Sequence, residues 1–268
     1  MNKALNPFMP AFWSLEAFSA IARMRQLYGG GRKTITAYPL KYLRYWFVRQ
    51  LLEQQARRLG RPLAVLEVGV DRGQMRAFMG EREQTARLIG RWDAIDVAPR
   101  HEELQRLGYD AIRQLDVDHG AEPALTRDYD AMIFLHVLEH LHQPEACLLA
   151  FRPYLAPSGV ILGGSPTMPK FIADAGYERR LARRARPYKH VSVISPERLD
   201  RFAERANLDI TFLSGAFLLR KEGSPIENSR LWMRLNLLWG SLFPALGSEL
   251  YFALEATAPS RPRVAAID

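Results

Sequence analysis

Residues 66–74 have the sequence LEVGVDRGQ, in which an apolar run carries an acidic residue and ends in a turn that contains two glycines. The run belongs to a short apolar stretch over residues 63–68, which is typical of a buried strand. Glycines in such a turn let a ligand approach bare backbone, and the turn lies at the carboxyl edge of a parallel sheet. This stretch therefore predicts a strand–turn–helix unit with a binding site at its turn.

Further short apolar runs alternate with helical stretches on either side of this unit, as in βαβ folds with a mainly parallel sheet. We expect an α/β, doubly wound, seven-stranded and mostly parallel sheet, with helices on both faces and the last strand antiparallel. Residues 1–60 have helical periodicity, with helices from Ser14 and from about Pro39. The expected strands cover residues 63–68, 92–97, 111–116, 129–135, 159–164, 208–219 and 249–256.

Composition limits the partners and the compartment. The chain has 268 residues and a formal net charge of +8, so phosphates, nucleic acid or anionic lipid are plausible partners. Cys147 is the single cysteine, which excludes an internal disulfide and favours a reducing compartment. The sequence shows neither a signal-peptide core nor an uninterrupted apolar stretch long enough to span a bilayer. We expect a cytoplasmic protein.

The glycine turn does not fit a nicotinamide-dinucleotide fingerprint, because Asp71 and Gln74 occupy two positions at which that motif needs glycine. A second acidic residue supports a different nucleoside ligand. Asp96 ends the next strand, about 20 residues after Gly73, the spacing at which a carboxylate meets ribose hydroxyls. The alternative for Asp96 is a structural cap of the turn before Pro99.

These motifs together resemble those of class I S-adenosylmethionine-dependent methyltransferases. Residues 66–69 with Gly73 are similar to the first motif of that family, and residues 94–96 to its second. The stretch YDAMIFLHVLEHL at residues 129–141 is similar to the fourth-strand motif of the subgroup that includes ubiquinone-biosynthesis and related small-molecule methyltransferases. His190 ahead of a helix over 196–207 also follows the subgroup. Asp71 departs from the family, which usually has a second glycine there.

The resemblance implies S-adenosylmethionine as the cofactor and assigns roles to particular residues. His136 and His190 are the candidates for a general base, while Glu139 and His140 are expected to cap the following helix. No metal is expected. The residues implied in cofactor binding are Glu67, Gly69, Gly73, Asp96, Val97, Asp116, Val117 and Leu135.

Residues 136–140 also satisfy the H-x-x-E-H pattern of a class of zinc proteases. That chemistry needs both histidines on one helix. His136 directly follows an apolar strand, so we expect His136 and His140 not to share a full helical turn, and we reject the protease interpretation.

Two inserts are expected to modify a domain over residues 61–268, to which residues 1–60 add a helical cap over the cofactor mouth. An acceptor-side insert over 165–190 carries a basic stripe, in which Arg183 and Arg186 with Tyr188 are candidates for binding an anionic acceptor. A solvated helix face is the alternative.

A helical insert over 226–247 stacks leucines on one face. Core packing, a dimer seam or a peripheral contact with the inner face of a membrane would each explain that face. The leucines are Leu231, Leu235, Leu238 and Leu242, with Trp232 and Trp239 nearby and Phe8, Phe12 and Trp13 as further membrane candidates.

The sequence thus predicts methyl transfer from S-adenosylmethionine to a small-molecule or envelope-type (glycan or lipid) acceptor. An RNA methyltransferase is the enzymatic alternative, disfavoured because the chain has no appended nucleic-acid module and no Asn-Pro-Pro-Tyr or paired-cysteine motif. A catalytically degenerate methyltransferase fold that acts as a scaffold or membrane-associated partner protein is the other alternative. It depends on the departure at Asp71.

Overall fold

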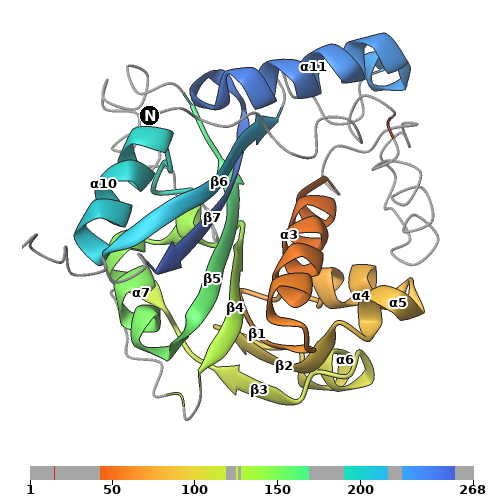
Figure 1. Ribbon diagram of the computed structural model, residues 1–268, viewed down its shortest axis with the longest axis vertical. Coiled ribbons are helices and arrows are strands. Elements are labelled where there is room, and N and C mark those ends of the chain that lie inside the picture. Colours follow the sequence, from red (N-terminus) through yellow and green to blue (C-terminus); the bar gives the residue numbers. More distant parts are fainter. Residues whose placement is uncertain are drawn as a thin grey trace, which may run out of the picture.

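A computed structural model describes residues 15, 43–118, 125, 128–168, 190–216 and 225–256. Its centre is a seven-stranded sheet with the strand order β3-β2-β1-β4-β5-β7-β6 (Figure 1). The strands are β1 (Leu63–Val68), β2 (Ile89–Asp96), β3 (Ala111–Gln114), β4 (Tyr129–Leu135), β5 (Leu155–Pro166), β6 (Leu208–Ala216) and β7 (Glu249–Ala256).

Strand β7 is the antiparallel member of the sheet. It lies between β5 and β6 and pairs antiparallel with both, whereas the pairs among β1 to β5 are parallel. The order reverses between β1 and β4, because β2 and β3 extend the sheet to one side and β5 extends it to the other. Such a switch point opens a crevice at the carboxyl edge, where ligands bind in doubly wound folds.

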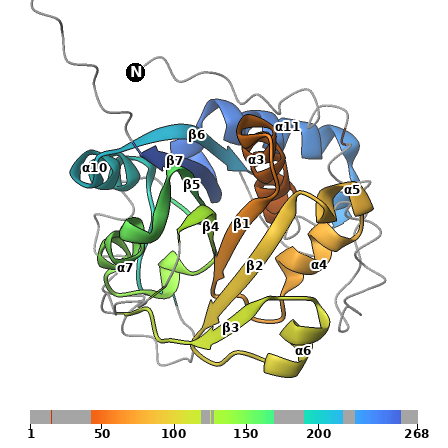
Figure 2. The same ribbon diagram turned by 60° about the horizontal axis from the view of Figure 1, so that its bottom comes forward.

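Helices cover both faces of the sheet, as the view in Figure 2 shows. On one face α3 (Leu43–Leu59), α4 (Gln74–Gly80), α6 (His101–Arg106) and α11 (Arg230–Leu242) share a core with the strands. On the other face α7 (Pro144–Phe151) and α10 (Pro196–Ala206) pack through residues such as Phe151 and Phe202. A short helix, α5 (Glu83–Ala86), follows α4. The predicted fold class is confirmed.

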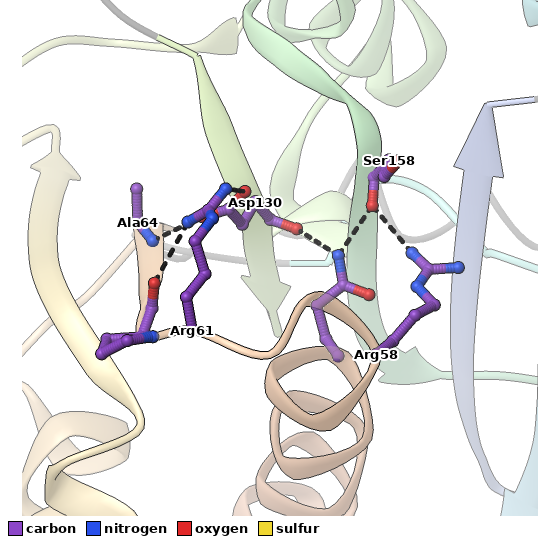
Figure 3. Close-up of polar contacts among 7 residues, drawn as sticks. Arg58, Arg61, Ala64, Asp130 and Ser158 are labelled. Atoms are coloured by element: carbon purple, nitrogen blue, oxygen red, sulfur yellow. Dashed lines mark hydrogen bonds and ion pairs between the residues drawn. The ribbon is translucent and has the colours of Figure 1, made fainter.

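The amino edge of the sheet is held by a polar network at the end of α3 (Figure 3). Arg61 donates to both carboxylate oxygens of Asp130 at 2.7 Å, and the same carboxylate accepts from the Ala64 amide at 2.9 Å. Gln55 Nε2 donates to the carbonyl oxygens of Asp130 and Ser158 at 3.1 and 2.7 Å. These bonds fix α3, β1, β4 and β5 at the edge opposite the crevice.

Several element bounds differ from the sequence expectation. Strands β1, β4 and β7 have the expected bounds, but β5 begins at Leu155 because that residue pairs with Tyr129. Strand β3 ends at Gln114, before the expected Asp116. The helix expected from Ser14 and the start of the one expected from Pro39 lie outside the described residues, as do residues 217–219 of the sixth strand.

Within the N-terminal cap the structure describes Leu15 and α3, and α3 packs on the sheet against β4, β5 and β7. Among the described helices, none is long and apolar enough to span a bilayer.

Candidate functional site

A cavity of about 750 Å³ opens at the carboxyl ends of β1, β2, β3 and β4. Its volume is within the range of sites for small molecules and cofactors. The loop after each of these four strands contributes to its wall, and Val191 closes one side. No residue of α3 lines the cavity, and residues 1–14 and 16–42 of the expected cap lie outside the described residues. From the expected site set, the cavity is lined by Gly69, Asp96, Val97, Asp116, Val117 and His136.

The turn after β1 depends on left-handed backbone conformations. Gly69 has φ +71°, and a Cβ atom there would lie 2.4 Å from Val137 Cγ2. Gly73 has φ +70°, and a Cβ there would lie 2.7 Å from Leu107 Cδ1. Asp71 also takes a positive φ, of 48°, although it carries a side chain. Asp tolerates this region better than most residues, at a cost of roughly 1–2 kcal/mol. The turn therefore keeps the backbone path that a glycine would take.

Asp96 ties this turn to the end of β2. Its Oδ2 accepts from the Asp71 amide at 3.0 Å, and its Oδ1 accepts from the Ala98 amide at 2.9 Å. Each carboxylate oxygen has a further lone pair, and the side chain lines the cavity. Asp96 thus performs the structural capping role and still offers two acceptors, so the two interpretations made from the sequence do not exclude each other.

The loop after β3 adds more carboxylates, and Val97 in the loop after β2 adds apolar surface. Asp116 Oδ1 accepts from the Asp118 amide at 2.9 Å, and Asp118 Oδ2 lies 2.6 Å from His142 Nδ1. Val97 lines the cavity and is 45 % exposed. An exposed valine between two acidic loops suits a planar apolar group flanked by polar atoms.

Glu67 lies in the interior and does not line the cavity. Its Oε2 accepts from Tyr109 Oη at 2.6 Å and from Trp92 Nε1 at 3.1 Å. Burial raises the pKa of Glu67 to about 7, although both hydrogen bonds oppose this shift. The structure thus turns the carboxylate away from the position expected at the methionine end of a cofactor. Gly73 and Leu135 are likewise absent from the cavity wall, and Gly73 acts by allowing close packing of Leu107.

His136 lies between two buried carboxylates at the cavity wall. It has φ +56°; its Nδ1 is 2.9 Å from Glu139 Oε1, and its Nε2 is 3.0 Å from Glu249 Oε2. Burial alone would raise the pKa of Glu139, but the hydrogen bond and charge of His136 outweigh it and lower that pKa. With both ring nitrogens directed at carboxylates, the geometry holds the imidazole ring in one orientation.

Glu249 was missed by sequence reasoning. It begins β7, 113 residues from His136, and is 1 % exposed. Nothing in its local sequence distinguishes it from an ordinary acidic residue at a strand start. Ser165, whose Oγ donates to Glu139 Oε2 at 3.1 Å, was also missed, because its local sequence is that of an ordinary strand serine.

His190 lies beside His140, outside the cavity wall. The two rings are 5.0 Å apart at 67°. Ligand atoms of Glu139, His140 and His190 all lie within 4.8 Å of one another, so this group could hold a metal ion. Residues 138–140 form a 3₁₀ turn and His136 is left-handed, so the zinc-protease arrangement is absent, as predicted. Arg183, Arg186 and Tyr188 lie outside the described residues.

A mostly parallel sheet with a cavity at its switch point, walled by strand-end carboxylates and a glycine turn, is an arrangement in which doubly wound folds bind nucleosides. Residues 41–212, more than half of the chain, match the family model described as a methyltransferase domain. The chain therefore belongs to the methyltransferase family, and the predicted class is confirmed.

Solved structures agree with this fold. The chain is similar to the plantazolicin methyltransferase BamL in complex with SAH, at 12% identity and a TM-score of 0.52, over 93% of this chain and 94% of that one. It is also similar to the 1,6-didemethyltoxoflavin-N1-methyltransferase of Burkholderia thailandensis, solved with S-adenosylhomocysteine, at 15% identity and a TM-score of 0.50, over 96% and 93% of the two chains. None of the curated proteins matches this chain.

Proposed function

We propose that this protein transfers a methyl group from S-adenosylmethionine, bound in the 750 Å³ cavity, to a small-molecule or anionic acceptor. The observation that carries the proposal is the wall of that cavity, where Asp71, Asp96, Asp116 and Asp118 follow three neighbouring strands. Carboxylates suit a ligand that carries a sulfonium, an ammonium group and a ribose diol.

The residues present fit this cofactor group by group. Asp96 has two oxygens for a diol, Val97 and Val117 offer apolar surface for a base, and the turn at Gly69 exposes backbone. The similar methyltransferase of Burkholderia thailandensis holds S-adenosylhomocysteine, which supports the same class of ligand here. Arg100 Nε lies 3.8 Å from Asp71 Oδ1. If Asp71 contacts the cofactor, the guanidinium of Arg100 has to move away from that carboxylate.

S-adenosylmethionine supplies an electrophilic methyl group on a sulfonium when bound. The chain then has to orient the acceptor in line with that methyl and keep water away. His136 with Glu139 and Glu249 makes a fixed, buried cluster at the cavity wall. The two buried carboxylates beside His136 suit a cationic donor.

The degenerate-scaffold alternative depended on Asp71. Because Asp71 takes the left-handed conformation and its amide donates to Asp96, the turn keeps the shape that cofactor binding needs. This supports an enzyme. We assign the recognition of the acceptor to Arg183, Arg186 and Tyr188, and RNA methylation is the alternative.

Calorimetry with S-adenosylmethionine tests the proposal. The wild-type chain should bind one equivalent, and Asp96→Ala should weaken binding about 10- to 100-fold, since hydrogen bonds to a charged group contribute about 1.5–3 kcal/mol.

Asp209→Ala is the matched control, because Asp209 is an exposed aspartate in β6, away from the cavity. Circular dichroism should show that Asp96→Ala is folded, since this variant also loses two bonds to the turn. Absence of heat with wild-type protein, or equal affinity in the Asp96→Ala variant, would contradict the proposal.

A further inference from the structure

Three potential metal ligands meet next to the cavity. Glu139 and His140 belong to the 3₁₀ turn after β4, and His190 precedes α10. One ligand atom from each lies within 4.8 Å of the other two. Glu139 is buried, His140 is half-buried and His190 is exposed, so the group runs from the interior to the surface.

The backbone brings these residues together without help from an ion. The carbonyl oxygen of Glu139 accepts from the amides of Val191 and Ser192 at 2.7 and 3.1 Å. Ser192 Oγ donates to the Leu141 carbonyl oxygen at 2.6 Å. These bonds fasten the segment that carries His190 to the turn that carries His140, and a site built in this way needs little rearrangement to bind an ion.

The carboxylate of Glu139 is also held in place by its neighbours. Ser165 Oγ donates to Oε2 at 3.1 Å, while His136 Nδ1 lies 2.9 Å from Oε1. Hydrogen bonds of this kind orient ligands in metal sites, and their loss weakens metal binding. Each carboxylate oxygen retains lone-pair capacity beyond these contacts.

We propose that Glu139, His140 and His190 bind one divalent transition-metal ion, for which Zn²⁺ is the probe. Two imidazoles and one carboxylate are a common zinc donor set, and three protein ligands leave one position open. Ligand atoms of tetrahedral zinc lie about 3.3 Å apart, so these side chains, which now lie within 4.8 Å of one another, would move closer together on binding the ion.

The open position would face the cavity, because His140 lines it. An ion there would bind an acceptor through a hydroxyl or anionic oxygen and would lower the pKa of a hydroxyl. This role rests on the proposed function, whereas the metal site itself does not.

Zinc calorimetry and the visible absorption of the Co²⁺-loaded protein test the site without any methyl donor. The wild-type chain should bind one equivalent. His190→Ala changes an exposed side chain and should leave the fold intact, but it should weaken Zn²⁺ binding by more than about 100-fold, as should His140→Ala. Ser165→Ala should weaken binding about 10- to 100-fold, because Ser165 only orients Glu139.

His142→Ala is the matched control, since His142 lines the same cavity but pairs with Asp118. Its zinc affinity should equal that of the wild type. Absence of zinc binding, or binding that survives both His140→Ala and His190→Ala, would overturn the proposal. S-adenosylmethionine calorimetry on the same samples separates the two ideas: zinc binding without cofactor binding would leave the metal site standing and refute the methyltransferase function.

Discussion

Asp71 shows how a single residue can keep the shape of a motif while departing from its sequence. It stands where related enzymes usually have glycine, yet it takes φ +48° and its Oδ2 accepts from Gln74 Nε2 at 2.9 Å. The local hydrogen bond is typical of how Asp offsets the strain of this conformation.

Two substitutions of Asp71 should show how much the left-handed conformation of this residue costs in stability. Asp71→Val should lower the free energy of unfolding by about 1–2 kcal/mol, because a β-branched residue is poorly accommodated at positive φ. Asp71→Gly should stay within about 1 kcal/mol of the wild type, because relief of strain offsets added freedom in the unfolded chain. Denaturant unfolding measures both, and a Val variant as stable as the Gly variant would show that the turn is not left-handed.

Glu67 should make stability depend on pH. Its folded pKa of about 7 lies above its ordinary value of 4.5, so the folded state holds a proton that the unfolded state has released. This contribution is fully present below pH 4.5 and is lost as pH rises toward 7. Relative to Glu67→Gln, the wild type should lose about 3 kcal/mol of unfolding free energy across that window.

Urea unfolding of the wild type and of Glu67→Gln at several pH values measures this difference. Glutamine keeps an acceptor for Tyr109 and Trp92, so the variant isolates the ionisation. Parallel curves for the two proteins between pH 4.5 and 7 would mean that Glu67 is already ionised in the folded state.

At the scale of elements, α11 exposes leucines that its sequence pattern would bury if the helix belonged to the core. Met233 and Leu237 are buried, whereas Leu231 is 64 % and Leu235 49 % exposed. Six of the eight exposed large hydrophobic residues in the described part of the chain lie in or beside this helix: Ile226, Leu231, Leu235, Leu242, Phe243 and Leu246. The helix also carries Arg230 and Arg234 and no acidic residue. The prediction that the leucine face of α11 packs in the core is therefore wrong.

We predict that α11 binds the surface of anionic membranes. The protein should sediment with vesicles that contain phosphatidylglycerol, and high salt should release it. Leu231→Glu with Leu235→Glu should abolish sedimentation, since burial of one leucine contributes about 1.5–3 kcal/mol. Leu149→Glu, an exposed leucine on α7, is the control.

Analytical ultracentrifugation without lipid tests the competing explanation, a dimer seam. A dimer that the double variant dissociates, combined with absence of vesicle binding, would refute membrane docking.

At the scale of the whole molecule, the strands of the sheet were predictable because short apolar runs in the local sequence specify them. Alternating apolar runs and helices gave the strands, and residues 66–74 located the cavity. Gly69 and Asp96 were predicted from their places at strand ends, which parallel strands bring to one edge, whereas Asp116 and His136 were assigned by the resemblance to the methyltransferases; all four line the cavity.

The rest of the site depends on contacts that local pattern does not contain. In β1 the alternation of side chains turns Glu67 inward, away from the cavity. The resemblance to the methyltransferases assigned Glu67 to the cofactor without this information. Glu249 reaches His136 through the pairing of β7 between β5 and β6, a long-range choice. The meeting of His140 and His190 depends on backbone hydrogen bonds between segments about fifty residues apart.

The position of β7 between β5 and β6 has a consequence for biosynthesis. A ribosome makes residues 249–256 after both β5 and β6, and until they emerge those two strands have no common neighbour. The nascent chain can assemble β1 to β5 while it is still being translated, but β6 cannot join the sheet until β7 is available to pair with both β5 and β6. His136 acquires its second carboxylate in the same event, so completion of the protein's fold and completion of its site coincide.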